Sequence, residues 1–194
     1  MKPTALPFFV STDDPPAKQA ILLGAMDLFA TRGVDGVTVR DIAARSGYTN
    51  PALFKHFATK DDLARSLFEA CYRRLAAALA MPGADLRAVV TAALALIETA
   101  PDAVHFTLEN LRRFWRDMPD DLRAQGLPGA MRRRIEQAQG QGSVRADIDP
   151  ALAGSLVLGM LAQIARMAHF AELPGPAGTL ADAVFAMIDR GIGA

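Results

Sequence analysis

Hydrophobic residues recur along most of this chain at the spacing of three and four that is typical of an amphipathic helix. The clearest case lies within residues 38–57. Val39, Ile42 and Ala43 fall on one helical face, and a short polar segment separates them from a second apolar pair, Leu53 and Phe57. The pattern predicts two short helices that bury these residues in a common core.

Polar residues and glycine at fixed positions define the ends of these two helices. Thr38 and Asp41 have the spacing of a capping box, in which each side chain satisfies an amide at a helix start. Gly47 is expected to end the first helix in the left-handed conformation. Thr49 is placed to cap the second helix, and Pro51 sits in its first turn, where a missing N–H is harmless. Together these signals predict a helix-turn-helix.

The outward face of the second helix mixes small, aromatic, amide and cationic groups. Pro51 and Lys55 point almost directly away from Leu53, with Ala52 and Phe54 beside them and Asn50 and His56 at the margins. A solvated helix usually carries Glu and Lys there, whereas a helix that enters the major groove of DNA needs a mixed face. The alternative is a helical hairpin with a random surface.

Residues 21–67 closely resemble the DNA-binding domain of the tetracycline-repressor (TetR) family of regulators. The matching positions lie in three helices and are Ile21, Leu22, Ala25, Leu28, Phe29, Gly33, then Thr38, Val39, Ile42, Ala43, Gly47, then Leu53, Phe54, His56, Phe57, Lys60 and Leu63. The resemblance implies a DNA-binding regulator, most commonly a homodimeric repressor released from a palindromic operator by a small molecule.

The same resemblance implies roles for individual residues. Groove-facing positions are Asn50, Pro51, Ala52, Phe54, Lys55 and His56, with Arg40 reaching a base edge, and phosphate-contacting positions are Thr38, Thr49 and Lys60. Phe54 stands where the family commonly has Tyr, so the phenolic hydrogen bond to phosphate is missing.

Composition restricts the class of protein. The 194 residues are 51% hydrophobic and 22% charged with a formal net charge of +0, which indicates a globular chain without a global field for nucleic acid. Positive charge is local instead, because the cations of residues 40–60 (Arg40, Arg45, Lys55 and Lys60) are opposed by Asp41 alone. One cysteine, Cys71, excludes an intramolecular disulfide, and the N-terminus lacks a signal-peptide layout. We expect a cytoplasmic protein.

The rest of the chain is predicted to be helical, which makes the fold class all-α. Expected segments are a flexible arm at 1–14, a DNA-binding domain at 15–60 and a ligand-binding and dimerisation domain at 61–194. After a long helix from Thr59 that ends at Met81, further helices are expected at about 84–99, 101–116, 119–125, 128–139, 150–170 and 178–190. The apolar stretch near 152–164 is interrupted by Ser155 and Gln163, and we expect it to fall short of a membrane span.

The helix at 150–170 is apolar nearly all round, so it is expected to pack on its own domain and on a second copy. With the last helix it supplies the predicted dimer interface: Leu152, Leu156, Gly159, Met160, Gln163, Leu180, Val184, Met187 and Ile188. A small, largely apolar effector is expected between the long fourth helix and the helices at 101–116 and 150–170. Its predicted contacts are Tyr72, His105, Phe106, Phe114, Trp115, Met160, Gln163 and Met167.

No catalytic motif, cofactor motif or phosphate loop is recognisable. His105 and Glu109 are four apart on a predicted helix, but two ligands without a third do not make a metal site. The arginines at 112, 113 and 116 and at 132–134 are expected on solvated helix faces. The alternative to a regulator is a helical-bundle enzyme or small-molecule-binding protein without DNA function, in which Phe54 would have no reason to be exposed.

Overall fold

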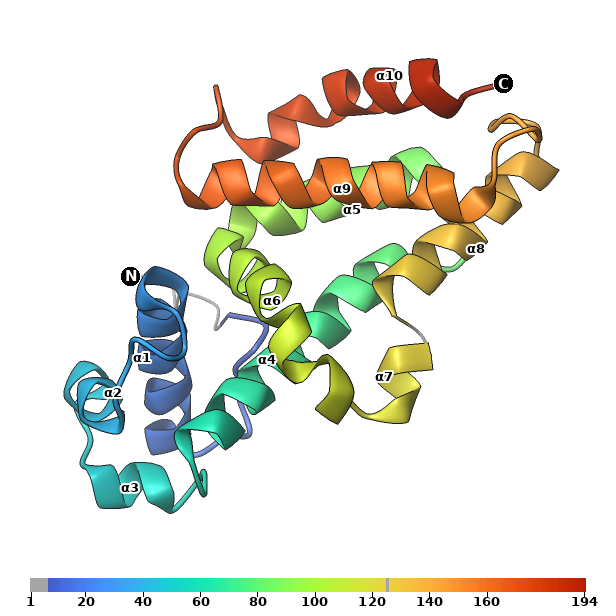
Figure 1. The fold of residues 1–194 in the computed structure, drawn as a ribbon. Helices are drawn as coiled ribbons and strands as arrows, with labels where there is room; N and C mark the ends of the chain where they lie inside the picture. The colour runs from blue at the N-terminus through green and yellow to red at the C-terminus, as the bar shows by residue number, and fades with distance from the viewer. Residues whose placement is uncertain (1–6, 125) are drawn as a thin grey trace. The chain divides into compact units, whose positions relative to one another are not determined.

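The computed structural model describes residues 7–124 and 126–194, and in these ranges the regular elements are helices, apart from one isolated bridge between Val144 and Gly193 (Figure 1). The prediction of an all-α fold is confirmed. In chain order the elements are α1 (Pro16–Arg32), α2 (Val39–Ser46), α3 (Asn50–Phe54), α4 (Lys60–Leu79), α5 (Leu86–Thr99), α6 (Pro101–Phe114), η1 (Trp115–Asp117), α7 (Asp120–Ala124), α8 (Leu127–Gly140), α9 (Pro150–His169), η2 (Ala177–Leu180) and α10 (Ala181–Ile192).

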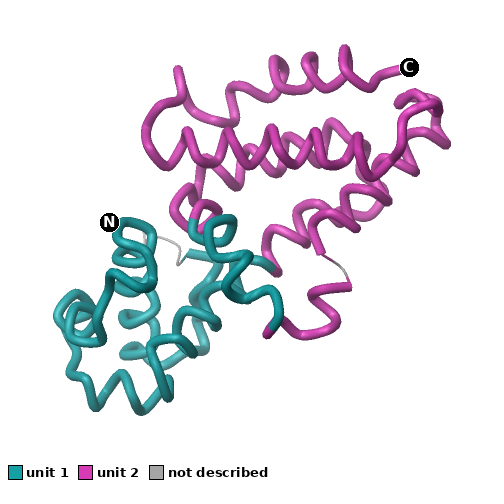
Figure 2. The backbone as a smooth tube through the Cα atoms, viewed as in Figure 1, with its two compact units in different colours: residues 1–72, 106–116 teal, residues 73–105, 117–194 magenta. Residues whose placement is uncertain are grey.

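Contacts divide the chain into two compact units (Figure 2). Unit 1 contains residues up to 72 and residues 106–116, and unit 2 contains residues 73–105 and 117–194. The helices α4 and α6 each contribute residues to both units. The predicted functional boundary after residue 60 stays a prediction, because compactness alone does not assign a function to either unit.

Unit 1 is built around α1, which packs against α2 and α3. The apolar stripe of α1 is buried in the same core as the fully buried Ile42 of α2 and Leu53 of α3. The close approach of α1 and α2 depends on Gly24, because a Cβ there would lie 3.2 Å from the backbone nitrogen of Ser46. A small, continuous apolar core therefore positions the helix-turn-helix.

Residues 7–14 form turns that are held against α1. The side-chain amide of Gln19 donates to the carbonyls of Ser11, Thr12 and Asp14, and Val10 is buried. This part of the expected arm is thus folded onto unit 1, and the remainder of the arm lies outside the described residues.

Unit 2 is a helical bundle in which α9 packs against α8 and α5, and α5 also contacts α10. The buried face of α9 consists of Ala153, Gly154, Val157, Leu161, Ile164 and Ala165. By length and composition this 20-residue helix, with a mean hydropathy of 1.5, could cross a membrane, which corrects the expectation that it is too short. Core helices of bundles pass the same test, and α9 has the packed face of such a helix.

Candidate nucleic-acid interface

The start of α2 is held by reciprocal hydrogen bonds between Thr38 and Asp41. The Thr38 hydroxyl oxygen accepts from the Asp41 amide at 3.2 Å, and the Asp41 carboxylate accepts from the Thr38 amide at 2.8 Å and from its hydroxyl at 2.7 Å. Both bonds lower the pKa of Asp41, and the bond from the hydroxyl has the larger effect. The predicted capping box is confirmed.

The turn between α2 and α3 follows the geometry that its residues predict. Gly47 adopts φ 75° and ψ 18°, a left-handed conformation that glycine reaches without a steric penalty. The Thr49 hydroxyl then caps α3 by accepting from the Ala52 amide at 3.4 Å, and Pro51 lies in the first turn. The helix-turn-helix is therefore defined by local interactions within a few residues.

The orientation of α3 separates a buried face from an exposed one. Leu53 is fully buried and Phe57 is 7% exposed, whereas Phe54 is 49% exposed. Of the other predicted groove-facing residues, Pro51 and Lys55 are exposed and Asn50, Ala52 and His56 are half-buried. Arg40, Thr38 and Thr49 are also exposed. The predicted DNA-contacting side chains of α2 and α3 therefore lie on the accessible side of the motif.

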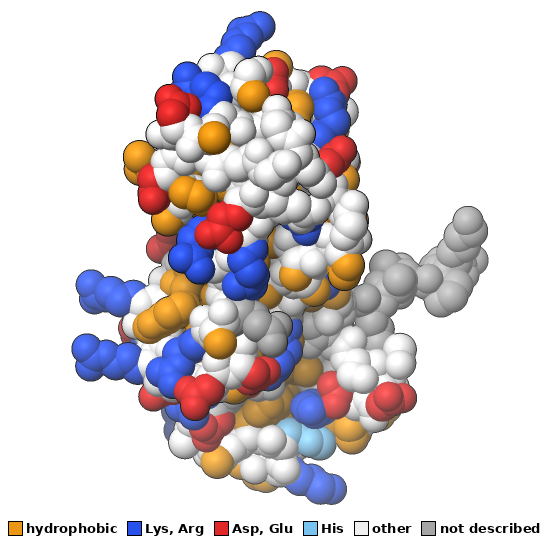
Figure 3. Space-filling model, turned by 90° about the vertical axis from the view of Figure 1, so that its right-hand side faces the viewer, with side chains coloured by type: hydrophobic (Ala, Val, Ile, Leu, Met, Phe, Trp, Pro, Cys, Tyr) orange, Lys and Arg blue, Asp and Glu red, His pale blue; other side chains and the backbone are white. Residues whose placement is uncertain are grey.

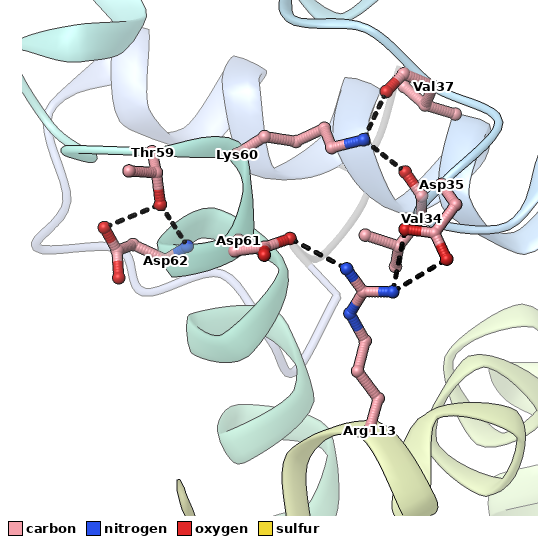
Figure 4. Close-up of polar contacts among 8 residues, drawn as sticks. All are labelled: Val34, Asp35, Val37, Thr59, Lys60, Asp61, Asp62 and Arg113. Atoms are coloured by element: carbon pink, nitrogen blue, oxygen red, sulfur yellow. Dashed lines mark hydrogen bonds and ion pairs between the residues drawn. The ribbon is translucent and has the colours of Figure 1, made fainter.

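The beginning of α4 fixes the connection between α1 and α2 (Figure 4). The Lys60 ammonium donates to the backbone carbonyls of Val34 and Val37, each at 2.7 Å, and is partly buried. Thr59 caps the same helix start, because its hydroxyl oxygen accepts from the Asp62 amide at 3.0 Å. Lys60 thus has an internal role in unit 1 that sequence reasoning did not foresee when it placed this residue at a phosphate.

Arg113 of α6 contributes to the same cluster (Figure 4). Its guanidinium donates to the Asp35 carboxylate at 2.8 and 2.9 Å and to the Asp61 carboxylate at 3.0 Å. Burial would lower the pKa of Arg113, but the hydrogen bonds to Asp35 and Asp61 raise it above its ordinary value. Arg113 is exposed, as expected, but its guanidinium also joins three segments that are distant in sequence.

Of the arginines at 132–134 that were expected on a solvated face, Arg132 and Arg133 are exposed, whereas Arg134 is not. It is only 7% exposed, and its guanidinium donates to the carbonyls of Met81, at 2.6 Å, and Ala84. These carbonyls follow the end of α4, so Arg134 satisfies polar groups of the α4–α5 connection inside unit 2.

Charge around the motif is positive but not uniform. Arg45 is paired with Asp27 at 2.7 Å, and this hydrogen bond raises the pKa of Arg45. Arg40 and Lys55 are both exposed, and neither forms an ion pair with a carboxylate in the described part of the chain. On the face that Figure 3 shows, basic and acidic side chains are interspersed. Any attraction for DNA therefore comes from a few local cations, as the net charge of +0 requires.

Three of the predicted effector contacts are buried in the aromatic core of unit 1. Tyr72 stacks on Phe68 with ring centroids 5.7 Å apart, Phe114 lies 5.3 Å from Phe68, and Phe106 stacks on Phe29 at 6.0 Å. Trp115 of the same unit is 39% exposed. Burial raises the pKa of the neighbouring Cys71 thiol to about 12, although a hydrogen bond with Thr107 opposes the shift.

The remaining predicted contacts (His105, Met160, Gln163 and Met167) belong to unit 2. His105 stacks on His169 with ring centroids 4.0 Å apart, and His169 Nδ1 lies 2.9 Å from an Asp102 oxygen. Within the described ranges, no group of three His, Cys, Asp or Glu side chains is arranged for a metal ion. An open pocket of about 290 Å³ in unit 2 is lined by Leu86, Phe185, Ile188 and neighbours, and by none of the predicted effector contacts.

The predicted dimer residues fall into three groups by exposure. Leu152 (68% exposed), Leu156 (48%) and Met187 (52%) are large apolar side chains in contact with solvent, and Gly159 and Gln163 are exposed beside them on α9. Met160 and Leu180 are half-buried. Val184 and Ile188 instead fill the interior of unit 2, with 2% and 0% exposure, so the opposite face of α10 is the accessible one.

The family profile of the bacterial regulatory proteins of the tetR type matches residues 21–67, which extend from α1 into α4. Among curated proteins, the HTH-type transcriptional repressor Rv3405c of Mycobacterium tuberculosis is 48% identical over 50 residues. That match covers 26% of this chain and about a quarter (27%) of the relative's length.

Two solved structures resemble the whole chain. The ketosteroid transcriptional regulator KstR2 of Mycobacterium tuberculosis has a TM-score of 0.78 at 21% identity, over 95% of this chain and 97% of its own. PfmR of Thermus thermophilus, a TetR family transcriptional regulator, has a TM-score of 0.71 at 26% identity, over 88% and 97%. The likeness therefore extends beyond the helix-turn-helix into the C-terminal helices.

Proposed function

Because the chain belongs to the TetR family of bacterial regulatory proteins, which are not enzymes, we propose that it is a homodimeric transcriptional repressor. It binds a palindromic DNA operator in the cytoplasm and is released from it by a small, largely apolar ligand. The observation that carries the proposal is the exposed outer face of α3, where Phe54 is 49% exposed while Leu53 is fully buried.

The proposed base contacts come from α3 and the proposed phosphate contacts from its surroundings. Asn50, Pro51, Ala52, Phe54, Lys55 and His56 approach the major groove, and Arg40 of α2 reaches a base edge. Thr38 and Thr49 lie at the starts of α2 and α3. The Thr49 hydroxyl can donate to a phosphate oxygen, whereas the Thr38 hydroxyl would first have to leave the Asp41 carboxylate. Tyr48, which is 37% exposed beside Thr49, is an additional candidate that sequence reasoning missed.

Lys60 has a competing interaction that bears on its proposed phosphate contact. Binding a phosphate would require its ammonium to leave one or both carbonyls of the α1–α2 connection. We therefore propose that Lys60 acts chiefly by holding this connection in place, and that Arg40 and Lys55 supply the main neutralising charges.

The proposed dimer uses the accessible faces of α9 and α10. Three large apolar side chains (Leu152, Leu156 and Met187) are about half exposed or more. Exposed large apolar side chains that gather on one face are typical of an interaction site. A second copy of the same chain supplies a self-complementary partner, since two-fold interfaces use the same patch twice.

The proposed effector is small and largely apolar because aromatic and methionine side chains dominate the predicted contacts. Polar groups among them are few, and those of Tyr72, His105 and Gln163 would orient a ligand through one or two hydrogen bonds.

A mobility-shift titration with the DNA that flanks the protein's own gene tests the proposal. We expect a discrete complex that survives an excess of unrelated duplex DNA and is weakened by Lys55→Met. A bundle protein without DNA function would show no sequence preference, and that result would favour the alternative of an enzyme or small-molecule-binding protein.

A further inference from the structure

Unit 2 contains an open cavity of about 290 Å³ beside the loop between α8 and α9, where α5 begins and α10 ends. This volume is close to the lower end of the range for small-molecule sites, which is about 300 Å³. Buried apolar side chains form much of the lining: Leu86, Val144, Ile188 and Ile192. None of the predicted effector contacts lines the cavity, so it is separate from the site expected for the effector.

An aromatic ring forms one wall of this cavity. Phe185 of α10 is half-buried, and the Arg87 guanidinium lies over its ring at 4.5 Å from the centroid. The same guanidinium donates to the Asp182 carboxylate at 2.7 Å. Because the charge of Arg87 is compensated by a carboxylate and by the face of a ring, this wall favours an apolar group over an anion.

Two carboxylates give the rim of the cavity a negative charge. Asp85 and Asp189 both line it, both are exposed, and neither forms an ion pair within the described ranges. The Asp85 carboxylate accepts from the Ala88 amide at 2.7 Å, which fixes it at the start of α5. The Asp189 carboxylate reaches over Gly193, since a Cβ added to this glycine would lie 2.7 Å from its Oδ1 atom. The rim therefore complements a cationic group above an apolar floor.

The cavity lies on a side of α10 that the proposed dimer does not use. Phe185 and Asp189 are four positions apart and share one side of the helix. Met187, which belongs to the proposed interface, is two positions from each of them and points in roughly the opposite direction. The accessible apolar face proposed for the dimer is therefore separate from the cavity.

We propose that this cavity is a second small-molecule site, which takes a small organic cation with an apolar body. The apolar body lies on the buried floor and against the Phe185 ring, and the ammonium group lies between the Asp85 and Asp189 carboxylates. The proposal concerns unit 2 alone and does not depend on DNA binding.

Three probes of similar size and different charge test the proposal on the full-length protein. Phenethylamine is protonated at pH 7, phenethyl alcohol is neutral and hydrocinnamate is an anion, and each is titrated while backbone amide resonances are followed by NMR. Phenethylamine should shift the amides of Val144, Ile188 and Ile192 saturably, with a dissociation constant on the order of 1 mM. Phenethyl alcohol should bind at least about threefold more weakly, because it lacks the ion pair, and hydrocinnamate should bind most weakly.

Matched variants assign the charge preference to the rim. Asp189→Asn keeps the shape of the side chain and should weaken phenethylamine about three- to fivefold while leaving phenethyl alcohol unchanged. It should not unfold the protein, because a carboxylate near the C-terminal end of a helix is unfavourable. Glu172→Gln removes an exposed carboxylate of unit 2 that does not line the cavity, and it should leave all three affinities unchanged.

Several results would overturn the proposal and leave the proposed function intact. Tighter binding of hydrocinnamate would show that Arg87 makes this an anion site. Equal losses of phenethylamine affinity in Asp189→Asn and Glu172→Gln would show that only overall charge matters. Shifts confined to the surroundings of Phe106 and Phe114 would place the probe at the expected effector contacts instead. The absence of a saturable shift at roughly ten times the expected dissociation constant would show that the cavity is not a binding site.

Discussion

Lys55 and Lys60 are close in sequence but have opposite surroundings. Lys55 is exposed on the outer side of α3, while the Lys60 ammonium is bonded to the Val34 and Val37 carbonyls. Lys55→Met should weaken operator binding and change the free energy of unfolding by no more than about 0.5 kcal/mol. Lys60→Met should lower that free energy by about 1–3 kcal/mol, because two carbonyls lose their donor.

Thermal denaturation and operator titration of both variants check that one change mainly affects affinity and the other mainly affects stability. Operator affinity of Lys60→Met is compared well below its melting temperature, so that only folded protein is measured. The contrary result would be a Lys60→Met protein with unchanged stability whose operator affinity is strongly reduced and less dependent on salt. That result would indicate that Lys60 contacts a phosphate directly.

Cys71 provides a second prediction, which concerns reactivity. The thiolate is the reactive form of cysteine, and burial raises the pKa of this thiol to about 12. At pH 8 the folded protein should therefore resist a disulfide reagent over minutes, whereas the protein in denaturant should react within seconds. Rapid, stoichiometric modification of the folded protein would show that the core around Cys71 is open.

Single residues also show how far the sequence could predict the site. The Thr38 and Asp41 cap, the Gly47 turn and the inward Leu53 all depend on neighbours within about one helical turn, and all were predicted. The contacts of Lys60 and Arg113 span 26 and 78 positions. No local pattern encodes such partners, because a charged side chain on a helix looks solvated until the tertiary fold places a carbonyl or carboxylate beside it.

Two glycines of α9 allow dimerisation to be tested separately from folding of the protomer. A Cβ added at Gly159 meets nothing within 4 Å in the protomer, whereas one at Gly154 would lie 3.2 Å from the Met131 side chain of α8. Gly159→Leu should therefore leave the melting of the isolated protomer unchanged and weaken dimerisation through a clash with the second copy. Gly154→Leu should destabilise unit 2 itself, since overpacking a core typically costs about 1–3 kcal/mol.

Sedimentation and circular dichroism of the two glycine variants distinguish these effects. A wild-type protein that sediments as a monomer at micromolar concentration, or a Gly159→Leu protein with unaltered dimerisation, would contradict the proposed use of α9. Gly154→Leu serves as the control for damage inside the protomer.

The helix boundaries were predictable to within a few residues. Expected helices at 84–99, 128–139 and 150–170 correspond to α5, α8 and α9. Asp85 caps the start of α5, and a proline lies in the first turn of α8 and of α9, which explains the agreement at their starts. The last expected helix, 178–190, is divided into η2 and α10. A change from a 3₁₀ to an α geometry does not alter the apolar pattern, so periodicity could not reveal it.

At the scale of the whole molecule, binding of the proposed effector should be coupled to release of the operator. A largely apolar compound that raises the melting temperature should also lower operator affinity, typically by about 5- to 150-fold, because the two ligands are coupled through one equilibrium. A thermal-shift screen of fatty acids, flavonoids and antibiotics, followed by operator titration with each hit, checks this. Hits that stabilise the protein and leave operator affinity unchanged would show binding without regulation.

Equilibrium titration of the operator, at several salt concentrations, tests the proposed DNA-binding function most directly. We expect two protomers per palindrome whose half-site centres are about 34–36 Å apart or a multiple of that spacing. If Arg40 and Lys55 of both protomers neutralise phosphates, the log–log slope of affinity against salt should be about −3.6, and about −5.4 if Lys60 also does so. Binding that is insensitive to salt and equal for operator and random duplex DNA would contradict a sequence-specific DNA-binding role.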